Sequence, residues 1–395
     1  MLISVLSNIK HLWQTMRVDI VDTVAVKKYE QKPKTLLVVH LDAIGDYILF
    51  RNFIEALRNS HAFSDYFVTL CGNEQYRDLA EWLDSGAITD FIWINRVRFR
   101  FDILYRFKMV RMIRARGFAV SVNPASSRIY YWGDSVIRAS GSTERIGSAG
   151  DAVNIKPWQK RKSDRFYTRL IPATSNCLFE FLRNRAFFAE LLGEPVALVR
   201  PFIEREKISG SSVSKRPYAV LFPGAGVPFR QWDSRNFARV ADYLTRQFGL
   251  TVVIAGSAAD KELAHRLSTL IREAHVVDVT GSSTLPELVG IIAHADILIS
   301  NETSAVHIAV AVGTRVVCIS NGNHLGRFSP YPSEMYSDAH YIYPRAIMEH
   351  PDDFEKLCAA FALKSCHDIN EINAEDVIEK VKNILSKTGA TPISL

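Results

Sequence analysis

The stretch ADILISNETSAVHIA, residues 295–309, passes from an apolar run into a polar turn and then into a helix. The run Ile297–Ile299 is typical of a buried strand, and the residues after it place hydroxyl groups and an imidazole in the first helical turn. The first N–H groups of a helix lack intrahelical partners and carry the positive end of its dipole, so this turn suits an anion such as a diphosphate. Taken alone, the same pattern is explained equally well as ordinary scaffolding.

Length and composition limit the class of protein. A chain of 395 residues is too long for one ordinary core and is expected to form two domains with peripheral elements. Its 48% hydrophobic and 23% charged residues indicate a globular protein. The net charge of +6 favours anionic partners. The five cysteines show no paired spacing, which is typical of a reducing compartment. We expect neither a membrane span nor a secretory signal, because no long apolar run is present.

Two halves of the chain repeat the same alternation of apolar strands and amphipathic helices. Alternating elements of these lengths predict an α/β fold, with two Rossmann-like, doubly wound domains facing across a cleft. A polar, Gly- and Ser-containing stretch at 207–215 is the expected linker between them. Helices are expected at about 234–248 and 285–294, and strands at 35–41, 67–70, 90–94, 118–122, 218–222, 251–255, 276–279 and 297–299.

Two further turns carry residue types that fit anion binding and acid–base chemistry. Residues 223–226, PGAG, would let the backbone approach a ligand, and Arg230 would supply a fixed cation for a phosphate. The turn 42–46 ends in Asp46, whose carboxylate would face a cleft from a helix start. A surface arginine and a helix-capping aspartate are the simpler alternatives. No GxGxxG follows the first strand and no GxxxxGK[ST] loop is present, so hydride-transfer and P-loop interpretations lose their main support.

Three blocks, in this order, resemble glycosyltransferase family 9, the heptosyltransferase-like enzymes of the GT-B fold. Residues 36–58 look like the family's N-terminal strand, acidic turn and helix. Residues 221–237 look like its proline–glycine turn, basic residue and tryptophan, and residues 281–330 look like its later helix and its acidic-Thr-Gly-x-x-His turn. Each block alone matches the family pattern only loosely, but three matching blocks in the same order and at compatible spacing are a fairly specific signal for the family.

The resemblance implies an inverting, metal-independent transfer of a sugar from a nucleotide-diphosphate donor to a lipopolysaccharide or other surface-glycan acceptor, with no cofactor. Asp46 would be the catalytic base on the acceptor hydroxyl. Arg230 would stabilise the departing diphosphate, aided by the positive helix end and by His307. Asp260 would hold the donor ribose. The other donor-binding residues expected from the resemblance are Pro223, Gly224, Ala225, Glu302, Thr303 and Ser304.

The composition of the linker and of the N-terminal segment, together with the resemblance, gives the expected domains and location. Residues 1–33 would be a helical extension, 34–210 the acceptor-side domain, and 211–395 the nucleotide-sugar-binding domain with a C-terminal helix. The protein would be cytoplasmic, with peripheral contact to the inner face of the bacterial inner membrane as a further expectation. Two departures from the family pattern, Glu302 for aspartate and Ser304 for glycine, are expected to reshape the sugar pocket, so the donor sugar and base stay open.

The segment 96–116 is basic independently of the family. It carries eight basic residues and one acid, which is a net +7 (eight minus one), with aromatic residues interleaved. Such a helix suits an anionic membrane face or a phosphorylated glycolipid acceptor, although a solvated polar helix is the simpler alternative. No nucleic-acid motif accompanies it, so nucleic acid is not an expected partner. The candidate contacts for the acceptor or membrane are Arg96, Arg98, Arg100, Arg106, Lys108 and Arg111.

Two other functions remain open from the sequence. A sugar-nucleotide epimerase or hydrolase on the same scaffold would bind the same donor without transferring its sugar to a glycan. A non-catalytic glycan- or nucleotide-binding protein would be consistent with the departures at Glu302 and Ser304. The presence of both Asp46 and Arg230 argues against that second alternative.

Overall fold

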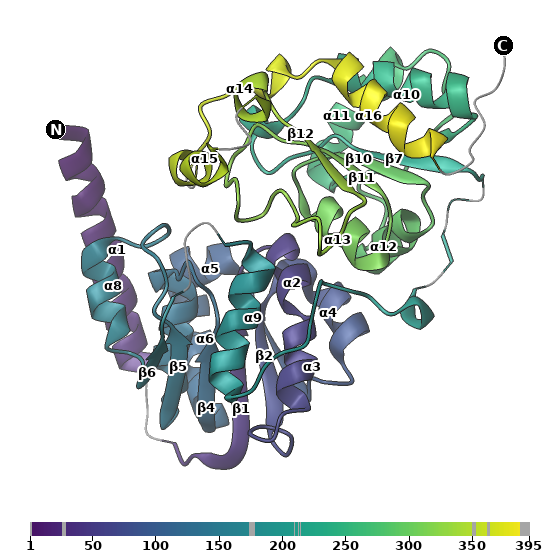
Figure 1. Cartoon of the computed structure of the whole chain (residues 1–395). Coiled ribbons are helices and arrows are strands. Elements are labelled where there is room, and N and C mark those ends of the chain that lie inside the picture. Colours follow the sequence, from purple (N-terminus) through teal and green to yellow (C-terminus); the bar gives the residue numbers. More distant parts are fainter. Residues whose placement is uncertain are drawn as a thin grey trace. The chain divides into compact units, whose positions relative to one another are not determined.

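A computed structural model describes residues 2–25, 29–173, 178–208, 210, 211, 213, 215–349, 353–361 and 364–387, with residues 2–10 described as backbone only (Figure 1). The chain divides into two compact units. Unit 1 comprises Met1–Thr174 and Leu182–Ala197, and unit 2 comprises Ser175–Phe181 and Leu198–Leu395. The domain limits expected at 33 and 210 stay predictions, and the units are described separately below.

Unit 1 is built on a six-stranded, fully parallel sheet in the order β3-β2-β1-β4-β5-β6. Its central strand carries the buried run 36–39, as expected for a strand covered on both faces. The strands are β1 Lys32–His40, β2 Phe67–Asn73, β3 Asp90–Ile94, β4 Phe118–Asn123, β5 Glu144–Ser148 and β6 Arg169–Ile171.

Helices cover both faces of this sheet. On one face, α6 and α7 pack against the strands through residues such as Val110 and Val136. On the other, Phe188 of α9 stacks on Phe53 of α3 with ring centroids 5.3 Å apart. The helices are α1 Leu2–Ala25, α2 Ile44–Phe50, α3 Asn52–Arg58, α4 Arg77–Asp84, α5 Arg96–Phe101, α6 Ile103–Arg116, α7 Ser135–Ser140, α8 Pro157–Asp164 and α9 Glu180–Leu192.

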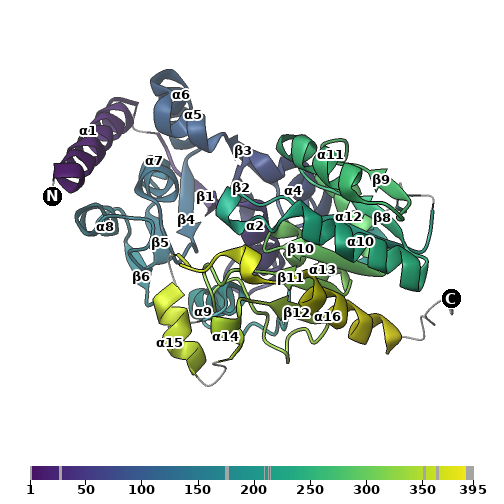
Figure 2. The same cartoon turned by 90° about the horizontal axis from the view of Figure 1, so that it is seen from above.

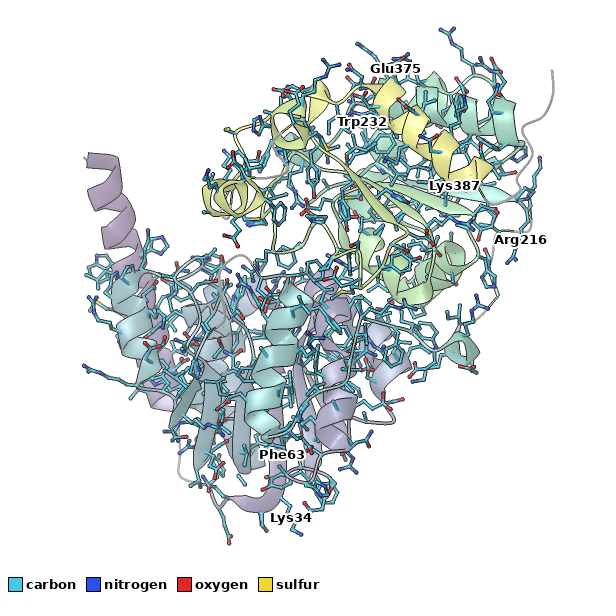
Figure 3. The ribbon with its side chains drawn as sticks, viewed as in Figure 1. Lys34, Phe63, Arg216, Trp232, Glu375 and Lys387 are labelled. Carbon is cyan, nitrogen blue, oxygen red and sulfur yellow. The ribbon has the colours of Figure 1, made fainter. Side chains whose placement is uncertain are left out.

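Unit 2 repeats this plan with the parallel order β12-β11-β10-β7-β8-β9. Its core includes Trp232, which lies beside the start of α16 (Figure 3) and donates from Nε1 to the Ile372 carbonyl at 2.8 Å. The strands are β7 Tyr218–Phe222, β8 Thr251–Ile254, β9 Val276–Asp278, β10 Ile297–Asn301, β11 Val316–Ile319 and β12 Ala339–Ile342.

The helices of unit 2 also lie on two sides of their sheet. α10 and α16 pack together over one face (Figure 2), while α12 and α13 pair with each other on the other. They are α10 Ser234–Phe248, α11 Lys261–Leu270, α12 Leu285–Ala293, α13 Ser304–Val312, α14 Arg345–Met348, α15 Phe354–Phe361 and α16 Ala374–Ser386.

The predicted α/β class with two doubly wound sheets is confirmed. All eight predicted strands are present, whereas β5, β6, β11 and β12 were not predicted. The basic segment 96–116 is not one helix, because Asp102 adopts an extended conformation and its side chain caps a second helix by accepting from the Tyr105 N–H at 3.0 Å. Within the described residues, no helix is both long enough and apolar enough to cross a bilayer.

Candidate functional site

Each sheet has a topological switch point where the strand order reverses. In unit 1 it lies between β1 and β4, and in unit 2 between β7 and β10. Open parallel sheets bind ligands outside the carboxyl ends of the strands at such points. Asp46 follows β1, Arg230 follows β7, and residues 302–304 follow β10. The expected catalytic and donor residues therefore come from strand ends that face the ligand-binding edge of their own sheets.

Asn301 joins the two strand ends at the switch point of unit 2. This buried amide donates from Nδ2 to the Pro223 carbonyl at 2.7 Å and accepts at Oδ1 from the Trp232 N–H at 3.2 Å. Both contacts go to the backbone of the loop after β7, so Asn301 sets the position of that loop relative to β10. This role was not predicted from the sequence, although an amide at the last position of a buried strand is a usable signal.

Arg230 is held at the same edge by Glu302. Its Nη2 donates to the Glu302 carbonyl at 2.7 Å and lies 3.1 Å from Oε1 of the Glu302 carboxylate. The other carboxylate oxygen, Oε2, accepts from the hydroxyl of Ser329 at 3.0 Å and from that of Ser320. Glu302 is buried and its carboxylate is engaged by these groups. It acts as an anchor for Arg230, which differs from the direct contact with donor that was expected.

The start of α13 lies directly after this anchor. Thr303 is the capping residue, with Oγ1 accepting from the Ala305 N–H at 3.3 Å, and Ser304 is the first helical residue. Both side chains are half-buried. The helix thus begins beside a guanidinium group whose position is fixed by hydrogen bonds, and both features favour an anion.

His307 lies one turn into α13 and is buried, with Nδ1 2.9 Å from the Tyr331 hydroxyl. Burial lowers its pKa from the usual 6.5 to about 3, and the charge of Arg230 adds to this effect. The imidazole is therefore neutral at physiological pH. The expectation that His307 aids diphosphate binding stays a prediction, and a neutral imidazole would contribute by hydrogen bonding and packing rather than by charge.

Asp260 joins the turns after β7 and β8. Its Oδ2 accepts from the N–H of Ser257 at 2.8 Å and from the hydroxyl of Ser257 at 2.6 Å. A Cβ added to Gly224 would lie 2.6 Å from Oδ1 of Asp260, so only glycine fits between this carboxylate and the turn. Next to it, the carbonyl of Ala225 accepts from Nε2 of Gln231 at 3.4 Å. Gly224, Ala225 and Asp260 thus meet at one edge, as a shared donor site requires.

Asp46 lies in the first turn of α2 and is half-buried. Its Oδ2 accepts from the Ala43 N–H at 3.2 Å, so the helix-capping role considered as its alternative is present. Capping does not exclude catalysis, because a carboxylate has further acceptor positions. Arg96 lies nearby at the same strand end and donates to the Leu41 carbonyl at 3.2 Å. This arginine therefore belongs to the switch point of unit 1 as well as to the basic segment.

The remaining basic residues of the segment 96–116 differ in exposure. Arg106 is buried, with Nε and Nη2 each 2.7 Å from the carboxylate of Asp22 in α1. Its Nη1 donates to the carbonyls of Phe99 and Tyr131, both at 3.0 Å. The expectation that Arg106 contacts acceptor or membrane is therefore wrong, because its donors are used to attach α1. Arg100 is half-buried, and the exposed candidates are Arg98, Lys108 and Arg111.

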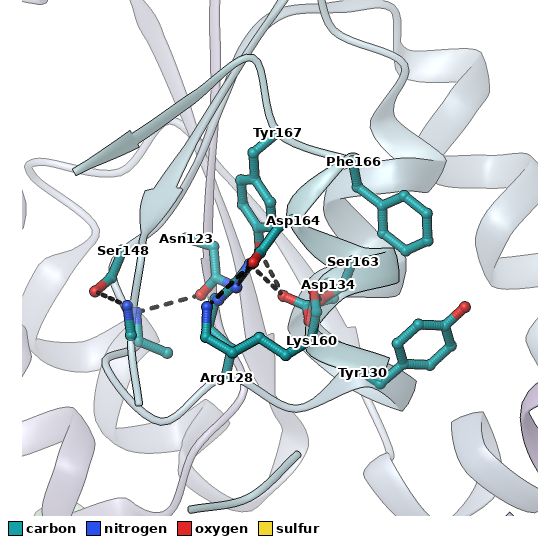
Figure 4. Close-up of polar contacts among 12 residues, drawn as sticks. Asn123, Arg128, Tyr130, Asp134, Ser148, Lys160, Ser163, Asp164, Phe166 and Tyr167 are labelled. Atoms are coloured by element: carbon teal, nitrogen blue, oxygen red, sulfur yellow. Dashed lines mark hydrogen bonds and ion pairs between the residues drawn. The ribbon is translucent and has the colours of Figure 1, made fainter. Parts of the chain in front are cut away.

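A buried polar network after β4 and β5 was also not predicted (Figure 4). The side chain of Arg128 is fully buried, lies 4.7 Å from the Tyr167 ring centroid and is 3.5 Å from Oδ1 of Asp134. The Tyr167 hydroxyl donates to the same oxygen at 2.6 Å, and Asn123 donates to that hydroxyl at 2.8 Å. Since the side chain of Arg128 has no exposure to solvent, its contacts join the loops at this end of the sheet.

Comparison with known proteins agrees with this geometry. Residues 180–342 match the model of glycosyltransferase family 9 (heptosyltransferase), and this range contains every donor-site residue of unit 2. This part of the chain is similar to glycosyltransferase family 9. Its resemblance to that family is thereby confirmed, although Asp46 lies outside the matched range.

Curated relatives are heptosyltransferases. The chain is 30% identical over 112 residues to lipooligosaccharide heptosyltransferase 2 of Haemophilus influenzae, covering 27% of this chain and 32% of that protein. It is 26% identical over 171 residues to the heptosyltransferase 2 of Campylobacter jejuni, covering 42% and 51%. The matches thus span about a third to a half of these relatives.

Solved structures match over nearly the whole chain. The glycosyl transferase family 9 protein of Veillonella parvula has a TM-score of 0.67 at 19% identity, covering 91% of this chain and 99% of that one. ADP-heptose lps heptosyltransferase II of E. coli has a TM-score of 0.65 at 17% identity, covering 90% and 99%. At these identities the likeness establishes the two-domain α/β fold shared with the GT-B heptosyltransferases.

Proposed function

We propose that the protein is an inverting, metal-independent glycosyltransferase that moves a sugar, heptose or another, from a nucleotide-diphosphate donor to a lipopolysaccharide or other surface-glycan acceptor. The observation that carries the proposal is Arg230 fixed by Glu302 beside the start of α13. The names of the curated heptosyltransferase relatives support the sugar-transfer class and the lipopolysaccharide acceptor. We place the reaction in the cytoplasm, at the inner face of the bacterial inner membrane.

The donor site is assigned to unit 2. A leaving nucleoside diphosphate gains negative charge as the bond to the sugar breaks, so its stabilisation requires groups that are already oriented. Arg230 supplies a guanidinium whose direction is set by the Glu302 carbonyl and carboxylate. The first N–H groups of α13 supply partial positive charge, because Thr303 caps the helix and Ser304 is its first residue. Asp260 is assigned to the donor ribose.

The catalytic base is assigned to Asp46 in unit 1. Inversion needs a single displacement, in which the acceptor oxygen attacks the anomeric carbon while the bond from that carbon to the diphosphate oxygen breaks. The proton of the acceptor hydroxyl passes to the carboxylate of Asp46, which is half-buried at the end of β1. Because the carboxylate is already held by the Ala43 N–H, its orientation is set before the acceptor binds.

The test combines donor binding with product analysis. The purified protein is screened by thermal shift against ADP-, GDP-, UDP-, CMP- and dTDP-sugars in the presence of a chelator, and a donor that binds is then incubated with lipopolysaccharide acceptors. Asp46→Asn preserves the shape of the side chain, so we expect unchanged donor binding and a transfer rate lower by about 10²–10⁴-fold. Asp42→Asn, four residues earlier in the same turn, is the matched control and retains transfer.

Each outcome of this test has a definite meaning. Transfer that continues unchanged in Asp46→Asn rejects the base assignment. Release of free sugar or an epimerised nucleotide sugar, with no glycan product, supports the epimerase or hydrolase alternative. Absence of a thermal shift with every donor rejects the transferase proposal, because a ligand that binds only the folded state must stabilise it.

A further inference from the structure

Helix α1 has its apolar residues on the outside. Trp13, Met16, Ile20 and Val24 recur every three or four residues and form one stripe with Leu12, and all five are exposed. The exposed fraction is 69% for Trp13, 62% for Ile20 and 69% for Val24. A helix on the surface of a water-soluble protein normally presents the opposite pattern, so this outward stripe indicates a partner that is itself apolar.

The orientation of α1 is fixed by polar contacts on its inner side. Asp22 is buried against Arg106, with two contacts of 2.7 Å. Thr15 is buried and accepts from Nε2 of Gln159 in α8 at 2.9 Å. Rotating the helix to bury the apolar stripe would break these contacts and leave Arg106 as an unpaired buried charge, which is costly. The outward position of the stripe is therefore a built feature of the fold.

A second exposed apolar group lies at the corner between α5 and α6. It consists of Val97, Phe101, Ile103 and Leu104, the last of which is 73% exposed. This corner is joined to α1, because Nη2 of Arg17 donates to the carbonyl of Arg100 at 3.0 Å. We call the α1 stripe and this corner together the apolar face of unit 1.

Charge identifies the partner of the apolar face. Every acid described in α5, α6, α8 and residues 11–25 of α1 has a basic partner, and so has the capping Asp102. These acids are Asp19, Asp22, Asp102 and Asp164. Exposed basic residues of α5, α6 and α8, and of the two positions next to α8, include Arg98, Lys108, Arg111, Lys156, Arg161, Lys162 and Arg165, of which only Arg98 and Lys162 pair with the acids just named. A second copy of the chain in a twofold contact would bring like charges together, which is unfavourable. An anionic lipid headgroup layer over an apolar interior matches both the charge and the apolar stripe.

We propose that the apolar face of unit 1 inserts into the surface of an anionic lipid bilayer, with α1 lying in the plane of the interface. This face would hold the protein at the membrane that carries the proposed glycolipid acceptor, so its use in catalysis rests on the proposed function. The lipid contact itself is independent of that function, because lipid binding needs neither donor nor acceptor. Since no described helix can cross a bilayer, the contact is interfacial.

The experiment measures sedimentation of the full-length protein with vesicles of phosphatidylcholine, with and without phosphatidylglycerol. Trp13→Glu/Ile20→Glu places two charges on the stripe without touching a buried contact, and we expect its affinity for the mixed vesicles to fall by about tenfold or more. The matched control is Val199→Glu in unit 2, because Val199 is 62% exposed, as Ile20 is. Arg98→Glu/Lys108→Glu/Arg111→Glu is expected to weaken binding to phosphatidylglycerol, and salt is expected to do the same.

Insertion of α1 is measured by tryptophan fluorescence with vesicles of brominated lipid. Brominated acyl chains quench indole fluorescence at close range, so the loss of fluorescence is expected to be smaller in Trp13→Phe than in the wild type. Three outcomes would overturn the proposal. They are wild-type protein that stays in solution with phosphatidylglycerol vesicles, a stripe variant that binds like wild type, and a wild-type dimer that the stripe variant dissociates without any vesicle binding. The last result would assign the face to a second copy.

Discussion

Arg230 and Glu302 form the contact that sets the chemistry of the donor site. Replacing Arg230 by alanine removes the proposed phosphate contact, and it also leaves the buried Glu302 carboxylate without its cation. We predict that Arg230→Ala weakens binding of the preferred nucleoside diphosphate by about 10–100-fold, because a charge-assisted hydrogen bond is worth about 1.5–3 kcal/mol. Isothermal calorimetry measures the change.

A second variant separates binding from folding in this prediction. In Arg230→Ala/Glu302→Gln the unpaired buried charge is absent, so we expect the melting temperature to recover while affinity stays low. Arg235→Ala is the control for removal of an exposed arginine close by in α10. If the double variant regains affinity together with stability, the loss in the single variant came from distortion and Arg230 is not a phosphate contact.

His307 gives the site a measurable dependence on pH. Burial lowers its pKa to about 3 in the folded protein, against about 6.5 in the unfolded chain. Between these values the unfolded state binds a proton that the folded state does not, so its contribution is fully present above pH 6.5 and is lost as pH falls toward 3. We predict that His307→Gln makes the dependence of unfolding free energy on pH shallower by about 1.4 kcal/mol per unit between pH 6 and 4.

Urea unfolding at several pH values checks this effect, and His265→Gln is the matched control, because His265 is exposed in α11. The same slope in wild type and His307→Gln would show that the buried imidazole is protonated in the folded protein. His40 follows the same rule in unit 1, since burial lowers its pKa to about 3 and Arg96 adds to the effect.

The sequence could indicate Arg230 and the turn after β10, but not what their side chains contact. Glu302 was expected to contact donor because it directly follows a strand at the ligand-binding edge. Its carboxylate is instead engaged by Ser320 and Ser329. These serines come from loops far along the chain, and their hydroxyls carry no sequence signal that they will be buried beside an acid.

At the scale of elements, α1 depends on the ion pair between Asp22 and Arg106. Both side chains are buried and form two contacts of 2.7 Å. We predict that Asp22→Asn destabilises unit 1 by about 3–5 kcal/mol, because it leaves a buried guanidinium without its counter-charge. Chemical denaturation followed by far-ultraviolet circular dichroism measures the loss.

The double variant Asp22→Leu/Arg106→Met tests the cause of that loss. A hydrophobic pair of similar volume removes the unpaired charge, so stability is expected to return most of the way. Thr23→Val, at an exposed position of the same helix, is the control for a change in α1 that leaves the ion pair intact. Equal destabilisation in the double variant would mean that the carbonyl contacts of Arg106 matter more than its charge.

Strand prediction succeeded where both faces of a strand are buried. β1 and β10 show continuous apolar runs, which mark such strands directly. In β5 only Ile146 is a large apolar residue, and β6 has three residues at the edge of its sheet, so neither carries a periodic signal. β11, with the buried run VVCI, shows the same apolar pattern and could have been predicted.

The break between α5 and α6 has a different cause. The alternation of basic and aromatic residues from 96 to 116 contains no proline or glycine and predicts one helix. Asp102 ends the first helix because its side chain competes for the Tyr105 N–H. That break exposes Phe101, Ile103 and Leu104, so a single capping interaction contributes three of the nine residues of the apolar face.

At the scale of the whole molecule, each unit has its own sheet and its own hydrophobic core. Units of this kind commonly unfold as separate cooperative transitions. We predict two calorimetric transitions, of which Asp22→Asn lowers only the one belonging to unit 1. A nucleoside diphosphate, which lacks the sugar and the acceptor, is predicted to raise only the transition of unit 2, by about 2.7 kcal/mol of stabilisation at a hundredfold excess over its dissociation constant.

The calorimetric result separates nucleotide binding, assigned to unit 2, from the catalytic base and the membrane contact, assigned to unit 1. Every residue assigned to the nucleotide, from Pro223 to His307, lies in unit 2, whereas Asp46 and the apolar face lie in unit 1. A nucleotide that raises the transition marked by Asp22→Asn would contradict the donor assignment. If phosphatidylglycerol vesicles raise that same transition while the nucleotide leaves it unchanged, donor binding and membrane binding belong to separate units. A variant of one can then be studied with the other intact, because sites that share no partner residues usually contribute independently to stability.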